Sequence, residues 1–241
     1  MEHWETLRPG GYRFLWEDSL FRPGTDTFLL SSLPRLKPGL RVVDLCCGAG
    51  LLGLLLLQRQ QDLFVTGLEL QAEPIRLGER TAAENGLLDR LSFRQGDIRQ
   101  VRTLFPAGSF DLAVGNPPYY PAGSGNLSAT LPLSRAEIAC TLADVCAAAG
   151  WLLRYGGSFC LVHKPERLAE LFNALRNAGL EPKRLQTVHT RPEKAPSLIL
   201  AESRKGGRPG LIWERPLVLK TASGAPTEEL NEIYFRKEHT P

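Results

Sequence analysis

The sequence predicts an α/β protein with a mostly parallel seven-stranded sheet, helices on both faces and an antiparallel pair of strands at one edge. Short apolar runs alternate with segments of helical periodicity along most of the chain, which is typical of strand and helix units in a parallel sheet. A glycine-containing turn follows the first buried run and opens a helix. No internal repeat interrupts this order, so a single sheet is expected.

The N-terminal part precedes the sheet. Residues 11–22 are rich in aromatic side chains and turn residues, which predicts a short hairpin. A helix is expected to follow through residue 33, with Thr25 or Asp26 as its N-cap, because short polar side chains accept hydrogen bonds from the first turn.

The first strand of the sheet is predicted over residues 41–45, and it runs into a glycine turn before a helix that begins at residue 51. Gly48, Gly50 and Gly53 satisfy a G-x-G-x-x-G pattern, so binding of a nicotinamide dinucleotide has to be considered. Asp44 lies four residues before Gly48, and this acidic strand end points to a different cofactor, as described below.

Two further strands bring carboxylates to their ends. Residues 63–69 end in Glu69, 25 positions after Asp44, where a carboxylate could accept both hydroxyls of a ribose. A helix over 73–85, capped by Gly86, leads to a strand over 91–98 that contains Asp97. Each carboxylate alone could be a helix cap or a solvated strand end, but together, in order, they favour a nucleoside site.

The run 110–115 predicts a buried strand that stops at Asn116-Pro117-Pro118-Tyr119. The prolines lack N–H groups, so this corner cannot continue a central sheet and its carbonyls can face a ligand. Those carbonyls and the Asn116 amide oxygen could accept both hydrogens of an exocyclic amine such as adenine N6, while the Tyr119 ring stacks on the base. The alternative is a plain turn that closes a strand.

Further elements are expected downstream, after a loop over 121–133. A helix over 134–153 would begin with a Ser134 to Glu137 capping box. The remaining predictions are a strand over 158–162, a helix over 165–177, strands over 180–189 and 197–202 that form the antiparallel edge pair, a strand over 211–219 and a helix over 227–235.

Composition favours one enzyme-sized domain. The 241 residues are 43% hydrophobic and 23% charged, and no stretch reaches the length of a membrane span. We expect a hairpin and helix over 1–34, a core over 40–203 and an extension over 204–241. The N-terminus resembles no secretory signal, and the five cysteines have no zinc spacing, so we expect reduced thiols, no metal and a cytoplasmic protein. A monomer is favoured.

Basic residues gather in one part of the sequence. The net charge of the chain is only +3, whereas the segment 176–208 contains eight basic and three acidic side chains, a local charge of +5. Such a segment could bind a phosphate backbone, or it could be an ordinary solvated surface. His163 could be a buried strand-end histidine. The candidates for RNA contact are Arg135, Lys164, Lys183, Arg184, Arg191, Lys194 and Lys205.

The sequence resembles the bacterial tRNA1(Val) (adenine-N6)-methyltransferases, which are class I S-adenosylmethionine-dependent enzymes with a Rossmann-like fold. The resemblance rests on 23–26, 44–50, 116–119, 134–137 and the region from 182 to 234. It implies S-adenosylmethionine as the cofactor and methylation of the adenine 3′ of a valine tRNA anticodon. The implied catalytic residues are Asn116, Pro117, Pro118 and Tyr119. The implied cofactor contacts are Thr25, Asp26, Asp44, Cys46, Gly48, Gly50, Glu69, Leu70, Asp97, Ile98 and Asn116.

Other functions remain open at this level. The Asn-Pro-Pro-Tyr corner also occurs in enzymes that methylate DNA adenine N6, ribosomal RNA guanine N2 and a protein glutamine amide. A non-catalytic RNA-binding module would have the same fold and bind RNA without modifying it. A nicotinamide oxidoreductase would require a hydride acceptor site and a general acid, and the corner over 116–119 offers neither.

Overall fold

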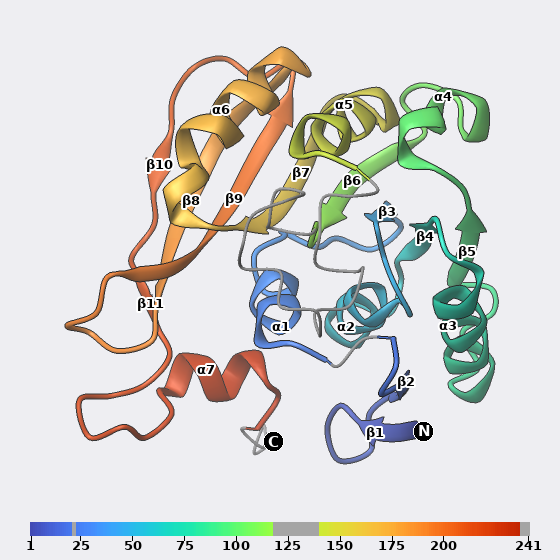
Figure 1. Ribbon diagram of the computed structural model, residues 1–241, viewed down its shortest axis with the longest axis horizontal. Coiled ribbons are helices and arrows are strands. Elements are labelled where there is room, and N and C mark those ends of the chain that lie inside the picture. Colours follow the sequence, from blue (N-terminus) through green and yellow to red (C-terminus); the bar gives the residue numbers. More distant parts are fainter. Residues whose placement is uncertain (21–22, 118–139, 237–241) are drawn as a thin grey trace.

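A computed structural model describes residues 1–20, 23–117 and 140–236, in which one large sheet lies between two layers of helices (Figure 1). The strand order is β10-β8-β9-β7-β6-β3-β4-β5, and β11 also pairs with β8. Strand β9 is antiparallel to both of its neighbours, and the other pairs in the sheet are parallel. The strands are β3 (Arg41–Leu45), β4 (Phe64–Glu69), β5 (Leu91–Gln95), β6 (Phe110–Gly115), β7 (Leu153–His163), β8 (Leu180–His189), β9 (Pro196–Lys205), β10 (Ile212–Trp213) and β11 (Leu217–Val218).

The predicted α/β fold with seven principal strands is confirmed, with one correction at the edge. The antiparallel pair, β8 and β9, is present. The two-residue strands β10 and β11 pair with the other side of β8, so β8 is not the outermost strand. These replace the single strand predicted over 211–219, because the chain pairs with β8 only at two short stretches.

The helices cover both faces because successive strand residues point to opposite sides. Val42 and Val114 pack into one apolar cluster, whereas Val43 and Ala113 pack into the other. The first cluster is covered by α1 (Thr25–Ser31), α2 (Leu51–Arg59), α3 (Ala72–Glu84) and α7 (Glu228–Ile233), and the second by α4 (Val101–Leu104), α5 (Leu142–Leu152) and α6 (Leu168–Asn177). Single turns η1 (Ile98–Gln100) and η3 (Pro165–Arg167) precede α4 and α6.

The N-terminal elements differ from the prediction in two details. The hairpin consists of β1 (Glu2–Thr6) and β2 (Arg13–Glu17), so it begins earlier than residues 11–22. The N-cap of α1 is Gly24 in an extended conformation, and no side chain of a described residue caps this helix. The prediction of Thr25 or Asp26 as the N-cap is therefore wrong, because both residues already lie in the first helical turn.

The helix that follows the corner over 116–119 also has a different start. Helix α5 is capped by Thr141 and Asp144, whose side chains and backbone N–H groups bond reciprocally. The capping box predicted at Ser134 and Glu137 lies outside the described residues. No helix in the described part of the chain is long and apolar enough to cross a membrane.

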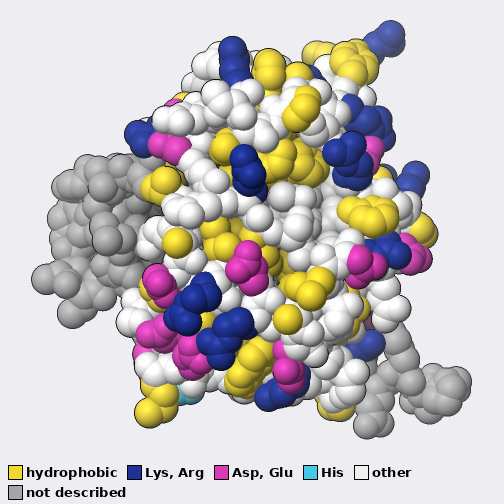
Figure 2. Space-filling model, turned by 90° about the vertical axis from the view of Figure 1, so that its right-hand side faces the viewer, with side chains coloured by type: hydrophobic (Ala, Val, Ile, Leu, Met, Phe, Trp, Pro, Cys, Tyr) yellow, Lys and Arg dark blue, Asp and Glu magenta, His cyan; other side chains and the backbone are white. Residues whose placement is uncertain are grey.

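The side of the molecule formed by β5, α3 and α4 has a surface of mixed charge (Figure 2). Basic side chains on α3 are paired there with acidic ones: Arg76 with Glu73, and Arg80 with Glu2. This edge of the sheet therefore presents no surface of a single sign.

Candidate active site

The predicted site residues meet at the carboxyl ends of the parallel strands. In the sheet register, Leu45 of β3 lies opposite Leu68 of β4 on one side and Gly115 of β6 on the other. The residues that follow, Cys46, Glu69 and Asn116, therefore lie along one edge. Ligands of open α/β sheets bind outside this edge.

The glycine turn between β3 and α2 is held by Glu69. One carboxylate oxygen of Glu69 accepts the backbone N–H of Gly48 at 3.0 Å, and the other accepts that of Gln71 at 3.1 Å. A carboxylate offers about four lone-pair positions, so Glu69 retains acceptor capacity for the hydroxyls of a ribose.

Two glycines in this turn have different surroundings. Gly48 has φ +55°, and a Cβ placed on it would meet nothing within 4 Å. Gly50 has φ +80°, and a Cβ there would lie 2.7 Å from the Phe93 ring. Gly50 is therefore required by packing, whereas the backbone at Gly48 borders space that the described residues leave open.

Asp44 is a buried carboxyl group beside this turn. Its side chain is 2% exposed, and Oδ2 has no hydrogen-bond partner among the described residues. The pKa of Asp44 is raised to about 8, mainly by burial and to a smaller extent by the nearby Glu69 charge, while a hydrogen bond from the Gly53 backbone opposes the shift. A buried polar atom without a partner is rare, and it fits a ligand that carries a positive group, as the methionine portion of S-adenosylmethionine does.

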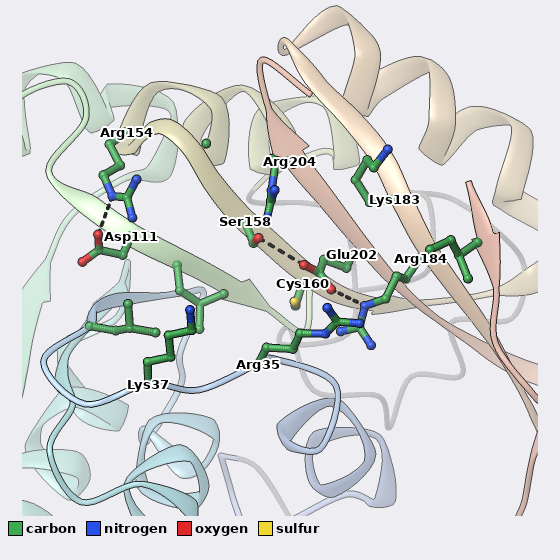
Figure 3. Close-up of a pocket in the computed structure, with 14 residues that line it drawn as sticks. Arg35, Lys37, Asp111, Arg154, Ser158, Cys160, Lys183, Arg184, Glu202 and Arg204 are labelled. Carbon is green, nitrogen blue, oxygen red and sulfur yellow. Dashed lines mark hydrogen bonds and ion pairs between the residues drawn. The ribbon is translucent and has the colours of Figure 1, made fainter. Parts of the chain in front are cut away.

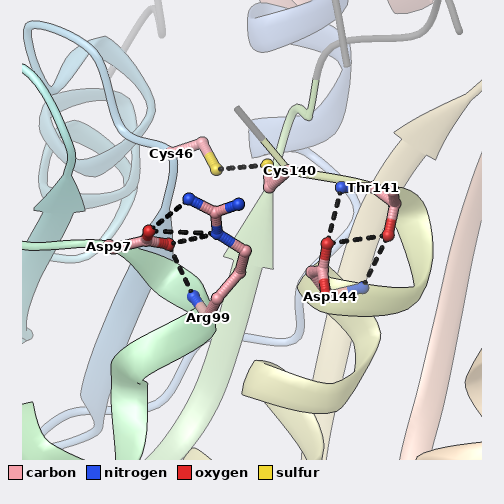
Figure 4. Close-up of polar contacts among 6 residues, drawn as sticks. All are labelled: Cys46, Asp97, Arg99, Cys140, Thr141 and Asp144. Carbon is pink, nitrogen blue, oxygen red and sulfur yellow. Dashed lines mark hydrogen bonds and ion pairs between the residues drawn. The ribbon is translucent and has the colours of Figure 1, made fainter. Parts of the chain in front are cut away.

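Asp97 lies after β5 and is paired locally (Figure 4). It caps η1 by accepting the backbone N–H of Arg99 at 2.9 Å, and its carboxylate also accepts the Arg99 guanidinium. The Arg99 hydrogen bond lowers the pKa of Asp97, which keeps this group ionised as an acceptor. Arg99 was not among the residues predicted from the sequence, although the Asp-x-Arg spacing indicates such a pair.

The two apolar residues predicted to contact the cofactor have different exposures. Leu70, directly after β4, is 43% exposed at the carboxyl edge and is available to a ring system. Ile98 is buried in the apolar cluster beneath α4 and α5.

Asn116 follows β6 and is fixed by a residue that the sequence did not reveal. Its amide nitrogen donates to Oγ1 of Thr27 at 3.1 Å, and Thr27 is buried in α1. This bond holds the side chain of Asn116 against α1. The two residues are 89 positions apart, and no sequence pattern indicates their contact.

Other predicted residues lie near this bond or outside the described chain. Thr25 and Asp26 lie in the same first turn of α1 as Thr27, Thr25 exposed and Asp26 partly buried. Pro117 is buried directly after Asn116. Pro118, Tyr119 and Arg135 lie outside the described residues.

The cysteines near the site are free thiols. Cys46 has φ 58°, and its sulfur lies 3.8 Å from that of Cys140, which precedes α5 (Figure 4). The contact with Cys140 and burial raise the pKa of Cys46, and burial also raises that of Cys47. These thiols are therefore protonated and poor nucleophiles. The described residues contain no group of three or more side chains that could hold a metal ion.

The predicted RNA contacts divide between the two ends of the sheet. Lys164 follows β7, and Arg191 and Lys194 lie in the turn from β8 to β9, so all three are at the same end as Asn116. Lys183 and Lys205 lie at the opposite end, in the first half of β8 and at the last residue of β9. His163 is fully buried, and burial lowers its pKa to about 4, so it is neutral.

Arg184 has a structural role. Its guanidinium is paired with Glu202 and Glu214 and donates to the Leu33 carbonyl at 2.7 Å, and the side chain is only 13% exposed. These bonds tie β8, β9 and the segment after α1 together. These bonds leave Arg184 less capacity to bind a phosphate backbone than the other predicted residues have.

Comparison with known proteins shows that the sequence of this chain is similar to those of methyltransferases. The family model described as methyltransferase small domain matches residues 22–178. A protein of Dickeya chrysanthemi named tRNA1(Val) (adenine(37)-N6)-methyltransferase is 31% identical over 217 residues, which cover 86% of this chain and 83% of that protein. A protein of Porphyromonas gingivalis with the same name is 30% identical over 189 residues, covering 76% and 74% of the two chains.

The fold is also similar to a solved structure. The crystal structure of a protein from Agrobacterium tumefaciens described as a predicted O-methyltransferase has a TM-score of 0.72 to this chain at 23% identity, covering 88% of this chain and 96% of that one. At this identity the likeness concerns the fold alone.

Proposed function

Because the chain belongs to the methyltransferase small domain family, we propose that it transfers the methyl group of S-adenosylmethionine to N6 of an adenine in tRNA. The names of its relatives specify adenine 37 of tRNA1(Val). We propose the same target for this chain, as the adenine 3′ of the anticodon. We further propose that residues 1–241 act as one domain, in the cytoplasm where tRNA is found.

S-adenosylmethionine supplies a methyl group on a positively charged sulfur, so the protein needs neither a metal nor a covalent intermediate. Asp44 and the turn at Gly48 would hold the methionine portion, Glu69 the ribose hydroxyls and Asp97 the adenine amine. The fit of this group rests on Oδ2 of Asp44, which has no hydrogen-bond partner among the described residues, and on the backbone at Gly48, where a Cβ would meet no described atom within 4 Å.

The observation that carries the proposal is the fixed amide of Asn116 at the end of β6. With its nitrogen bound to Thr27, its oxygen would accept a hydrogen of the target amine, and the Pro117 carbonyl would accept the other. Two acceptors favour a pyramidal nitrogen, which makes the amine lone pair available for attack. Positioning of donor and acceptor can contribute roughly 7–11 kcal/mol to lowering the barrier.

The base must leave its stack before it reaches this corner. Unstacking costs a few kcal/mol, and stacking on an aromatic ring returns roughly 1–3 kcal/mol. We propose Tyr119 for this role. Lys164, Arg191 and Lys194, which lie at the same end of the sheet as Asn116, would bind the RNA backbone.

The test is methyl transfer from labelled S-adenosylmethionine to total bacterial tRNA, followed by mapping of the modified nucleoside. Asn116→Ala should lower turnover at least ~100-fold, comparable to the loss of one oriented polar group in other active sites, and leave cofactor affinity near normal. Asn231→Ala, on α7, is the matched control and should retain full turnover.

The outcome separates the alternatives. N6-methyladenine at position 37 supports the proposal, whereas label in ribosomal RNA guanine, DNA or a protein amide would redirect it to another planar nitrogen. Binding of tRNA without any label transfer would indicate a non-catalytic RNA-binding module.

A further inference from the structure

A cavity lies at the amino ends of the central strands, away from the candidate active site (Figure 3). Its volume is about 460 Å³, and its floor includes Leu40, Leu112 and Cys160. The basic side chains that line it come from the segment after α1 and from β7, β8 and β9: they are Arg35, Lys37, Arg154, Lys183, Arg184 and Arg204.

The two carboxylates in the lining are already paired. Asp111 accepts from Arg154, and Glu202 accepts from both Arg184 and Ser158 (Figure 3). Glu214, which lies just outside the lining, accepts a hydrogen bond from another N–H group of Arg184. Neither carboxylate of the lining is therefore left to compensate the remaining cations.

Four of the basic groups that line this cavity are not paired with a carboxylate of any described residue. The side chains of Arg35, Lys37 and Arg204 have no hydrogen bond or ion pair with any described residue, and that of Lys183 donates only to the Arg208 carbonyl. Six cations against two carboxylates give the lining a net charge of +4, which exceeds the +3 of the whole chain.

The contrast with the opposite side of the molecule shows that this charge is local. On α3, neighbouring cations are paired with carboxylates, as Arg76 is with Glu73. Around the cavity, cations from four segments face one another with too few carboxylates, and like charges at close range are unfavourable unless an anion binds between them.

We propose that this cavity binds an anion that carries two or more phosphate groups. The planar guanidinium group of arginine can donate two parallel hydrogen bonds to phosphate oxygens, and the ammonium group of lysine adds a compact positive charge. The volume lies within the range of small-molecule sites, and it is larger than a single phosphate ion needs. The apolar floor offers space to a nucleoside or ribose attached to the phosphates.

The cavity is separate from the methyl-transfer site. Asp111 and Asn116 lie near opposite ends of β6, five residues apart, which corresponds to about 17 Å along a strand. The anion site therefore does not depend on the proposed methyl transfer, and it can be tested while cofactor binding is measured independently.

The experiment is calorimetric titration of the full chain with tripolyphosphate at low ionic strength, where screening is weak. We expect saturable binding of one molecule per chain. The double variant Arg35→Glu and Arg204→Glu should weaken it at least tenfold. The pair Arg76→Glu and Lys220→Glu, an equal change of charge outside the cavity, should leave it unchanged. Absence of saturable binding, or equal affinity in all three proteins, would overturn the proposal.

Two further measurements complete the test. Unchanged S-adenosylmethionine affinity in the double variant shows that it is folded, and the milder pair Arg35→Gln and Arg204→Gln replaces it if it is not. Competition between tripolyphosphate and tRNA would identify the natural phosphates as those of an RNA backbone. Independent binding of the two would identify a free oligophosphate or nucleotide.

Discussion

At the carboxyl end of the parallel strands, the side chains that lie near one another are carboxylates and an amide, Asp44, Glu69, Asp97 and Asn116. At the amino end of β6, β7 and β8, six basic side chains surround one cavity. Parallel strands connected by helices separate these chemistries. The helix N-termini and glycine turns meet ligands at one edge, and the helix C-termini, which favour cations, end at the other. One sheet thus provides two sites of different chemistry about 17 Å apart.

The largest expected effect is at the carboxyl end, for Asp44→Asn. The substitution removes the only negative charge that Asp44 can offer to a positive ligand group, and we expect S-adenosylmethionine affinity to fall at least 100-fold at pH 8. Because the pKa of Asp44 is about 8, the wild-type affinity should rise with pH up to about 8, whereas that of the variant should not. Calorimetry across pH 6–9 measures both.

The same variant should have the opposite effect on stability. The raised pKa means that the folded protein holds a proton that the unfolded chain releases near pH 4, so this stabilisation is complete below about 4 and is lost as the pH rises through about 8. The amide that replaces the carboxyl group in Asp44→Asn cannot ionise, so thermal melts of the ligand-free variant should lack this decline. The exposed Asp62→Asn is the control, and a decline of equal slope in Asp44→Asn and the wild type would contradict the assignment.

The positions of these carboxylates were predictable because a buried apolar run gives the end of a strand, and parallel strand ends share an edge. The division of the basic residues was not predictable. The segment 176–208 is compact in sequence, but it forms two ten-residue strands about 30 Å long. Lys183 and Lys194 therefore lie near opposite ends of the sheet. The Arg184 guanidinium is already paired with Glu202 of the neighbouring strand.

The hydrogen bond between Thr27 and Asn116 could not be predicted from the sequence either, because it depends on how α1 packs against the end of β6. Thr27→Val removes the hydroxyl and keeps the shape, so the half-buried Asn116 amide loses one partner, a loss of roughly 1 kcal/mol. We expect turnover to fall about tenfold, which corresponds to ~1.4 kcal/mol, with unchanged cofactor affinity.

Two comparisons distinguish positioning by Thr27 from a general loss of structure. Thr27→Ser retains the hydroxyl and should restore most of the turnover. A variant that loses turnover and cofactor affinity together, or equal defects for the Val and Ser variants, would show that Thr27 serves only to pack α1.

The smallest effects are expected for single phosphate contacts, and they test the division between the two ends directly. Each cation that neutralises a phosphate of single-stranded RNA adds about 0.7 to the slope of log affinity against log salt concentration. The triple variant Lys164→Ala, Arg191→Ala and Lys194→Ala should therefore lower that slope for tRNA by about 2 and weaken binding at low salt. The double variant Lys183→Ala and Lys205→Ala, at the opposite end of the same two strands, should change the slope by less than the value of about 0.7 expected for one phosphate contact. Equal changes per residue from both ends would mean that the RNA extends along the full length of β8 and reaches the cationic cavity, which would assign both surfaces to one ligand.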